Sequence, residues 1–218
     1  MSWLLFRGWK VSVISLTELQ QDAMAELLNI GMGRAASVLS EMVGEEVLLS
    51  VPFVDLMSRH DATGFLMAKA CDRIIAVLQK FSGLCWGDTM LVFPEEKSLE
   101  LVRSLFKDTD TTPLEVMTEM EQEALLEIGN IILNSCIGSI SDILHIEVSS
   151  TLPSLLCGSC EEILGTKDST RTDDEVVMLL RMNFALYARS MQGCVVFVVN
   201  GSAIPELQGK IDQLLSDL

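Results

Sequence analysis

Hydrophobic residues recur at helical spacing in two stretches of the chain, one beginning near residue 17 and the other near residue 118. The stripe consists of Met24, Leu27, Ala35, Val38 and Met42 in the first stretch, and of Leu125, Ile128, Ile132, Ser139 and Ile143 in the second. Each stretch opens with a capping box, Thr17-Glu-Leu-Gln20 or Thr118-Glu-Met-Glu121, whose side chains satisfy donors at a helix start. We therefore predict two amphipathic helices.

Extended segments follow each predicted helix. Short strands at 47–51 and 148–152 are expected to stop at Pro52 and Pro153, because proline pushes the residue before it toward extended geometry. Further β-rich segments lie at 64–70, 74–81, 176–184 and 194–199, and terminal helices are predicted near 99–106 and 205–218. This pattern of helices and strands predicts the α+β fold class.

The chain is an internal duplication. Shifting it by 101 residues aligns residues 17–52 with 118–153 without a gap, and 11 of the 36 aligned pairs are identical. A period near one hundred is too long for a solenoid repeat. We predict two helix-plus-strands units, 17–112 and 113–218, that share one sheet with the long helices packed on it. A pseudo-twofold axis would relate them within a single domain, 17–218, preceded by an N-terminal extension, 1–16.

Composition narrows the function classes. A chain that is 49% hydrophobic and 21% charged is globular, and its net charge of −16 argues against nucleic-acid binding and against docking on an anionic membrane. No apolar run reaches the roughly 18 to 20 residues of a membrane span. Six cysteines among apolar residues are typical of a reduced cytoplasmic protein. The lone Cys157-Gly-Ser-Cys160 pair lacks the partners of a zinc site, so we expect no metal site.

One segment, Gly31-Met-Gly33-Arg-Ala-Ala36, has the GxGxxA pattern of a dinucleotide-binding loop. Such a loop must follow a strand and open a helix. Here the glycines follow three turns of predicted helix, and the second copy has Ile132 and Asn134 in their places. We therefore predict a helix surface at this position, with no bound nucleotide.

The polar face of each helix carries the candidate chemistry. At 100° per residue, Asp22, Glu26, Asn29 and Gly33 lie within about 60° of one another, opposite the apolar stripe. A solvated polar face is usual for an amphipathic helix, so one copy alone indicates little. The second copy, however, keeps Glu and Asn three residues apart although most neighbours differ, and asparagine is a mediocre helix former. This repetition indicates that the carboxamide is used, and both pairs are predicted to be exposed.

These residues carry a resemblance to a known family. The spacing Asp22-x3-Glu26-x2-Asn29-x22-Pro52 resembles the pattern of the CheC/CheX/FliY chemotaxis phosphatases, in which Asp or Ser, Glu, Asn and a distant Pro follow at those intervals. Arg34 stands where that family often has Asn, which is expected to alter the rim of the first site.

The second copy resembles the same family pattern. Glu123-x3-Glu127-x2-Asn130-x22-Pro153 has the same intervals, with Glu in place of Asp or Ser at the first position. Two motifs in tandem are typical of the CheC members, and the first motif matches the pattern more fully than the second.

The resemblance implies hydrolysis of the aspartyl phosphate on a CheY-like response regulator. Asn29 and Asn130 would orient the attacking water, and Glu26 and Glu127 would reach the active-site lysine of the receiver. The remaining implied receiver-binding positions are Asp22, Gly33, Pro52, Glu123 and Pro153. Mg²⁺ would belong to the phosphorylated receiver, so this chain would need no cofactor of its own, and a CheD-like protein is a further implied partner.

Two other functions fit the same residues. The chain could be a non-catalytic adaptor that binds a receiver or a CheD-like protein, or an interaction module like the flagellar switch protein FliM, which resembles this family but lacks the Glu/Asn pairs. Release of phosphate from a phosphorylated receiver distinguishes the phosphatase from both.

Overall fold

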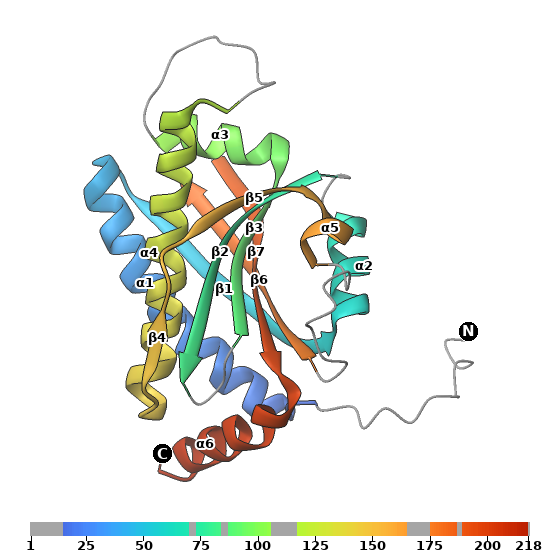
Figure 1. The fold of residues 1–218 in the computed structure, drawn as a ribbon. Coiled ribbons are helices and arrows are strands. Elements are labelled where there is room, and N and C mark those ends of the chain that lie inside the picture. The colour runs from blue at the N-terminus through green and yellow to red at the C-terminus, as the bar shows by residue number, and fades with distance from the viewer. Residues whose placement is uncertain are drawn as a thin grey trace, which may run out of the picture.

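One antiparallel sheet of seven strands organises the computed structural model, which describes residues 15–69, 73–83, 87–105, 117–164, 175–186 and 189–217 (Figure 1). The strands are β1 (Val47–Ser58), β2 (Arg73–Gly83), β3 (Gly87–Pro94), β4 (Val148–Ser150), β5 (Ser154–Ser159), β6 (Glu175–Leu186) and β7 (Arg189–Asn200). The helices are α1 (Glu18–Val43), α2 (Arg59–Lys69), α3 (Glu95–Leu105), α4 (Glu119–Leu144), α5 (Cys160–Leu164), the short 3-10 helix η1 (Gly201–Ala203) and α6 (Ile204–Ser216). Most of the predicted extension 1–16, and the predicted boundary between the halves at residue 112, lie outside the described residues.

The two halves of the chain are interleaved in the sheet. Its order is β1-β6-β7-β3-β2-β4, with β5 also paired to β2. Thus the first strand of the first half, β1, pairs with β6 of the second half, while β4 and β5 of the second half pair with β2 of the first. The predicted α+β fold, with two duplicated units sharing one sheet under long helices, is confirmed.

Helices cover both faces of the sheet (Figure 1). The long helices α1 and α4, with α3 and α6, bury the larger core, whereas α2 and α5 bury a smaller core on the opposite face. Along β2, Ile75 and Val77 enter the larger core and Ile74 and Ala76 the smaller one, because successive residues of a strand point to opposite faces. This two-sided burial leaves the outer faces of α1 and α4 to solvent.

The capping boxes predicted for α1 and α4 are both formed. In α1 the backbone N–H of Gln20 donates to Thr17 Oγ1 over 3.2 Å, and the Thr17 N–H donates to Gln20 Oε1 over 3.0 Å. The helices end differently. Gly44 closes α1 with φ 70°, whereas His145 closes α4 with φ 52°, a left-handed conformation that disfavours a residue with a side chain.

The first turn of α4 is also tied to α3. Arg103 Nε donates to Glu121 Oε1 over 2.7 Å, and both side chains are largely buried. Burial alone raises the pKa of the Glu121 carboxyl, but the hydrogen bonds from Arg103 and Thr118 hold that pKa below its usual value. The pair is therefore an anionic carboxylate bound to a cation.

Several details of the sequence prediction are wrong, among them that β5 and α5 were not predicted and that Val38 and Met42 of the predicted apolar stripe are exposed. Residues 64–69 belong to helix α2 and are not a strand, because Ser58 caps a helix start: the Asp61 N–H donates to Ser58 Oγ over 3.1 Å. Strand β1 does not stop at Pro52 but continues to Ser58. Strand β3 was not predicted at all.

Helix α4 is long and apolar enough, by length and composition, to cross a membrane. Half of its most apolar window is buried inside the protein, however, where residues such as Ile128 and Ile132 enter the larger core. Helix α4 is accordingly a core helix of this fold.

Candidate functional site

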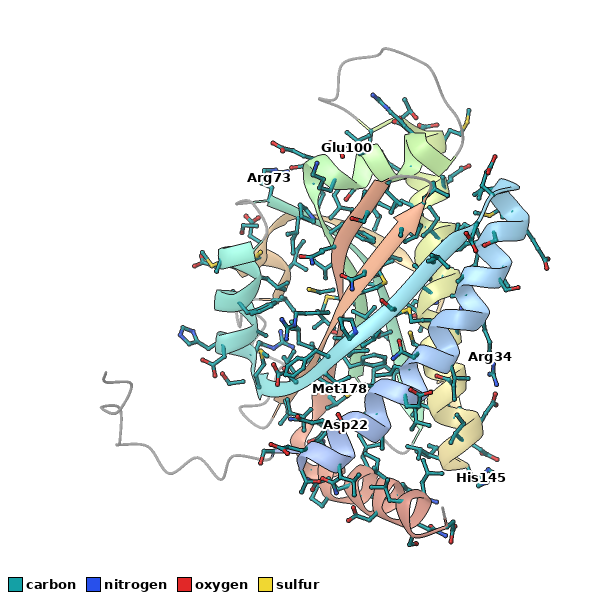
Figure 2. All side chains as sticks on the ribbon, turned by 180° about the vertical axis from the view of Figure 1, so that it is seen from behind. Asp22, Arg34, Arg73, Glu100, His145 and Met178 are labelled. Atoms are coloured by element: carbon teal, nitrogen blue, oxygen red, sulfur yellow. The ribbon has the colours of Figure 1, made fainter. Side chains whose placement is uncertain are left out.

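Helix α1 presents the first predicted motif on its outer side. Asp22 and Glu26 are exposed, and Figure 2 marks Asp22 in the first turns of the helix. Neither carboxylate makes a hydrogen bond or ion pair with any other described residue. Asn29, one turn further on, is only partly exposed because its carboxamide turns toward β1. The motif therefore combines two unpartnered carboxylates with one anchored amide.

The carboxamide of Asn29 is hydrogen-bonded at both ends to the backbone of Val51. Asn29 Nδ2 donates to the Val51 carbonyl over 3.1 Å, and Asn29 Oδ1 accepts from the Val51 N–H over 2.8 Å. A primary amide offers two N–H donors and two acceptor lone pairs, so one donor and one lone pair remain. The two bonds fix the rotamer, and the side chain presents its remaining polar positions in a set orientation.

A β-bulge makes Val51 available to Asn29. Ser50 pairs with Asn183 and Phe53 with Arg181, so Val51 and Pro52 together face a single residue of β6, Met182. Pro52 has no backbone N–H to give to the sheet. Val51 therefore bonds to the helix and not to β6. This arrangement gives a physical reason for the fixed interval between the asparagine and the proline, which the sequence pattern did not reveal.

Helix α4 presents the second motif with different hydrogen bonds. Glu123 and Glu127 are exposed, and Asn130 is partly exposed. Asn130 Oδ1 accepts two hydrogen bonds, one from Gln79 Nε2 over 3.0 Å and one from Asn134 Nδ2 over 2.7 Å. Both lone pairs of its oxygen are thus occupied, while its Nδ2 donates to no described residue.

A bulge also marks the second site. Ser150 pairs with Phe81 and Ser154 with Leu78, so residues 151–153 face only two residues of β2, at 79–80. One of these two residues is Gln79, whereas the bulge in β1 faces Met182. The residue opposite the bulge is therefore apolar at the first site and polar at the second.

Gln79 is 1% exposed and also donates to the Thr151 carbonyl over 3.2 Å, so its orientation is fixed. Sequence reasoning missed Gln79. A glutamine within the apolar run of a strand is the signal that could have found it.

The two sites lie at opposite edges of the sheet. Asn29 bonds to β1, which is the strand at one end, while Asn130 bonds to Gln79 of β2, which pairs with β4 and β5 at the other end. Neither Glu/Asn pair is in the core, and Pro52 and Pro153 lie on the bulged segments. The structure therefore keeps the two sets of predicted residues apart, and each set holds together.

We compared the chain with known proteins by sequence and by structure. No family model matches the chain. The curated relative named CheY-P phosphatase CheC, from Bacillus subtilis, is 25% identical over 140 residues, or 63% of this chain and 66% of the relative, just under two thirds of its length. The crystal structure of Thermotoga maritima FliY matches with a TM-score of 0.72 at 18% identity, over 91% of this chain and 98% of that one.

The chain resembles the CheC/CheX/FliY family in sequence and in fold. The fold extends beyond this family, since the middle domain of FliM from H. pylori matches with a TM-score of 0.59 at 12% identity, over 89% of this chain and 99% of that one.

The glycines of the GxGxxA segment have separate roles in this CheC-like fold. A Cβ atom at Gly31 would lie 2.6 Å from the Ser135 carbonyl oxygen, so Gly31 allows α1 and α4 to pack closely. Gly33 is exposed, and a Cβ there would meet nothing within 4 Å. Both glycines lie inside α1 and do not form a loop that could cradle a phosphate.

Arg34, which is expected to alter the rim of the first site, forms an ion pair with the neighbouring long helix. Its Nη1 lies 2.8 Å from Asp142 Oδ2, and this exposed ion pair connects α1 to α4. Figure 2 shows Arg34 projecting from α1 away from the sheet. An exposed ion pair of this kind contributes about 0–1 kcal/mol.

The two cysteines of the CxxC segment lie in different environments, because Cys157 is exposed on β5 and Cys160 is buried at the start of α5.

Proposed function

We propose that this protein hydrolyses the aspartyl phosphate of a CheY-like response regulator. The observation that carries the proposal is the Asn29 carboxamide, which two hydrogen bonds to Val51 hold one turn from the Glu26 carboxylate, a group with no partner among the described residues. A relative with 25% identity is named a CheY-P phosphatase, which supports the same reaction class.

The anchored amide suits this chemistry. Phosphoryl transfer requires mainly positioning and charge stabilisation from the protein. The remaining lone pair of Asn29 Oδ1 would accept a hydrogen bond from the attacking water and orient it, and the remaining Nδ2–H would donate a hydrogen bond to a phosphoryl oxygen. The water oxygen forms its bond to phosphorus as the aspartyl carboxylate leaves, which releases inorganic phosphate. A neutral amide does not repel the phosphoryl group, whereas a second carboxylate would.

The exposed carboxylates suit recognition of the receiver. Glu26 and Glu127 would each pair with a cationic side chain of the receiver, such as its active-site lysine. Leu152, which is 89% exposed on the bulged segment of the second motif, would provide apolar contact there. Mg²⁺ would arrive with the phosphorylated receiver, and a CheD-like protein would be a second partner. We place the reaction in the cytoplasm.

Phosphate release from a phosphorylated CheY-like receiver tests the proposal. The Asn29→Ala, Asn130→Ala double variant should lose roughly a hundredfold or more of the rate acceleration, as when a preorganised polar group is removed from other active sites. Each single variant should keep the share of the other site. A double variant as active as the wild type would exclude this mechanism.

A matched pair of variants separates receiver docking from general charge. Glu26→Ala should weaken receiver binding, and the loss should shrink at high salt because a charge pair is screened. Glu41→Ala removes the same charge from an exposed position on α1, about 22 Å further along the helix at 1.5 Å per residue, and should change little. A wild type that binds the receiver without releasing phosphate would indicate the adaptor. A wild type that does not bind the receiver would favour the FliM-like interaction module.

A further inference from the structure

The second site carries a polar cluster that has no counterpart at the first. Ser150 Oγ donates to Asn134 Oδ1 over 2.9 Å, and Asn134 Nδ2 donates in turn to Asn130 Oδ1 over 2.7 Å. The 101-residue shift places Gly33 and Leu49 at the corresponding positions of the first copy, neither of which has a polar side chain. The two sites therefore differ in the residues around the asparagine and not in the asparagine itself.

This cluster changes what the asparagine can offer to a substrate. At the first site, Asn29 Oδ1 accepts one hydrogen bond from its own chain and keeps one lone pair. At the second site, Gln79 and Asn134 occupy both lone pairs of Asn130 Oδ1, so this oxygen has no lone pair for a proton of the attacking water. Asn130 in this state can donate hydrogen bonds but cannot accept one from water.

The two occupying donors differ in how readily they can leave. Gln79 is 1% exposed and is also bonded to the Thr151 carbonyl, so it supports Asn130 from the sheet side, as the Val51 backbone supports Asn29. Asn134 is exposed and lies one helical turn from Asn130 on the solvent side. Asn134 is therefore the group that competes with water.

We infer that Asn134 is a specificity-determining residue that attenuates the second site by occupying the lone pair of Asn130 that the attacking water requires. The inference rests on the proposed phosphatase function. On this inference the two sites differ in turnover rate because of a single residue, Asn134, which lies one helical turn from Asn130. At the corresponding position of the first site, Gly33 has no side chain and its surroundings are open.

An exchange of the two residues tests this inference. In the Asn29→Ala background, where only the second site acts, Asn134→Gly should raise kcat on a phosphorylated receiver by roughly three- to tenfold, the factor for releasing one hydrogen bond. Asn134→Ala should raise kcat by the same factor as Asn134→Gly, and alanine is also the better helix former. In the Asn130→Ala background, Gly33→Asn should lower kcat of the first site at least twofold, and the space at Gly33 accommodates the side chain.

If Asn134 only stabilised the fold, Asn134→Ala would not raise kcat, because removing a stabilising side chain does not speed turnover. Ser150→Ala, which removes the anchor of Asn134, should raise kcat in the Asn29→Ala background by a smaller factor. If the wild type hydrolyses the phosphate, the double asparagine variant does not, and Asn134→Ala leaves kcat unchanged or lower, this inference is wrong and the proposed function stands. If the wild type releases no phosphate, both are wrong.

Discussion

Asn29 and Val51 are joined by two hydrogen bonds, one in each direction, at 3.1 Å and 2.8 Å. The side chain thereby replaces the neighbouring strand as the partner of a buried backbone segment, since Val51 is 0% exposed and lies on a bulge. The same carboxamide that we propose to act on water thus also connects α1 to β1.

Replacing Asn29 with alanine should lower the free energy of unfolding. The change leaves the N–H and carbonyl of Val51 without their partner, and an unsatisfied buried group costs about 1–3 kcal/mol. Asn130→Ala should cost less, because Asn130 makes no bond to a buried backbone group. Urea denaturation of the two single variants measures the difference. Equal losses for Asn29→Ala and Asn130→Ala would contradict the role assigned to the Val51 contact.

The two glycines of α1 should respond oppositely to alanine. Gly31→Ala should destabilise the protein by about 1–3 kcal/mol, because the new methyl group would push against the backbone of Ser135 where the long helices pack. Gly33→Ala should be neutral or stabilise by up to about 1 kcal/mol, since its surroundings are open and alanine is the better helix former. Thermal melts of the two variants provide the comparison. A tolerated Gly31→Ala would mean that the helices can separate at little cost.

The pair of Glu121 with Arg103 should make part of the stability depend on pH. The folded pKa of Glu121 is lowered, so its contribution is fully present above the unfolded pKa of about 4.3 and is lost as the pH falls through the folded pKa. Glu121→Gln should therefore cost about 1–3 kcal/mol at pH 7 and progressively less below about pH 4. Gln20, which caps α1 in the same way, shows that glutamine preserves the capping box. The measurement is urea unfolding of both proteins from pH 3 to 7, and a difference that does not vary with pH would exclude the ion pair as its source.

The end of α4 offers a stabilising substitution. His145 adopts φ 52°, which costs an L residue roughly 1–2 kcal/mol relative to glycine. His145→Gly should stabilise the protein by about 1 kcal/mol, and Gly44→His at the matching end of α1 should destabilise it by a similar amount. Denaturant midpoints of the two variants check both signs. A loss of stability in His145→Gly would show that the imidazole makes a compensating contact.

The sequence predicted the long helices well because their start signals are local. The capping boxes at Thr17 and Thr118 depend on residues three apart, and both are formed in the structure. The same kind of signal at Ser58 and Ser159 begins α2 and α5, and the 101-residue shift relates these two serines as well. The strand predicted at 64–70 is wrong because the cap at Ser58, upstream of it, starts a helix.

The hydrogen bonds of the candidate sites could not be predicted in this way. Periodicity placed Asn29 and Asn130 on polar helix faces, but their partners depend on strand register. Met182 and Gln79 face the two bulges from strands that are distant in sequence from the motifs, so no local pattern reports them. The sites therefore look equivalent in sequence and differ in structure.

The interleaving of the halves has a consequence for how the chain folds during synthesis. Strand β1 ends at Ser58, but its partner β6 begins only at Glu175, so more than a hundred residues must leave the ribosome before β1 has a neighbour. Until then the first half exposes a strand edge that could pair with another chain. Such distant pairings also imply slow folding, because the entropy of closing a long loop is lost before any contact compensates it. A nascent chain of this kind is a natural substrate for chaperones that shield unpaired strands.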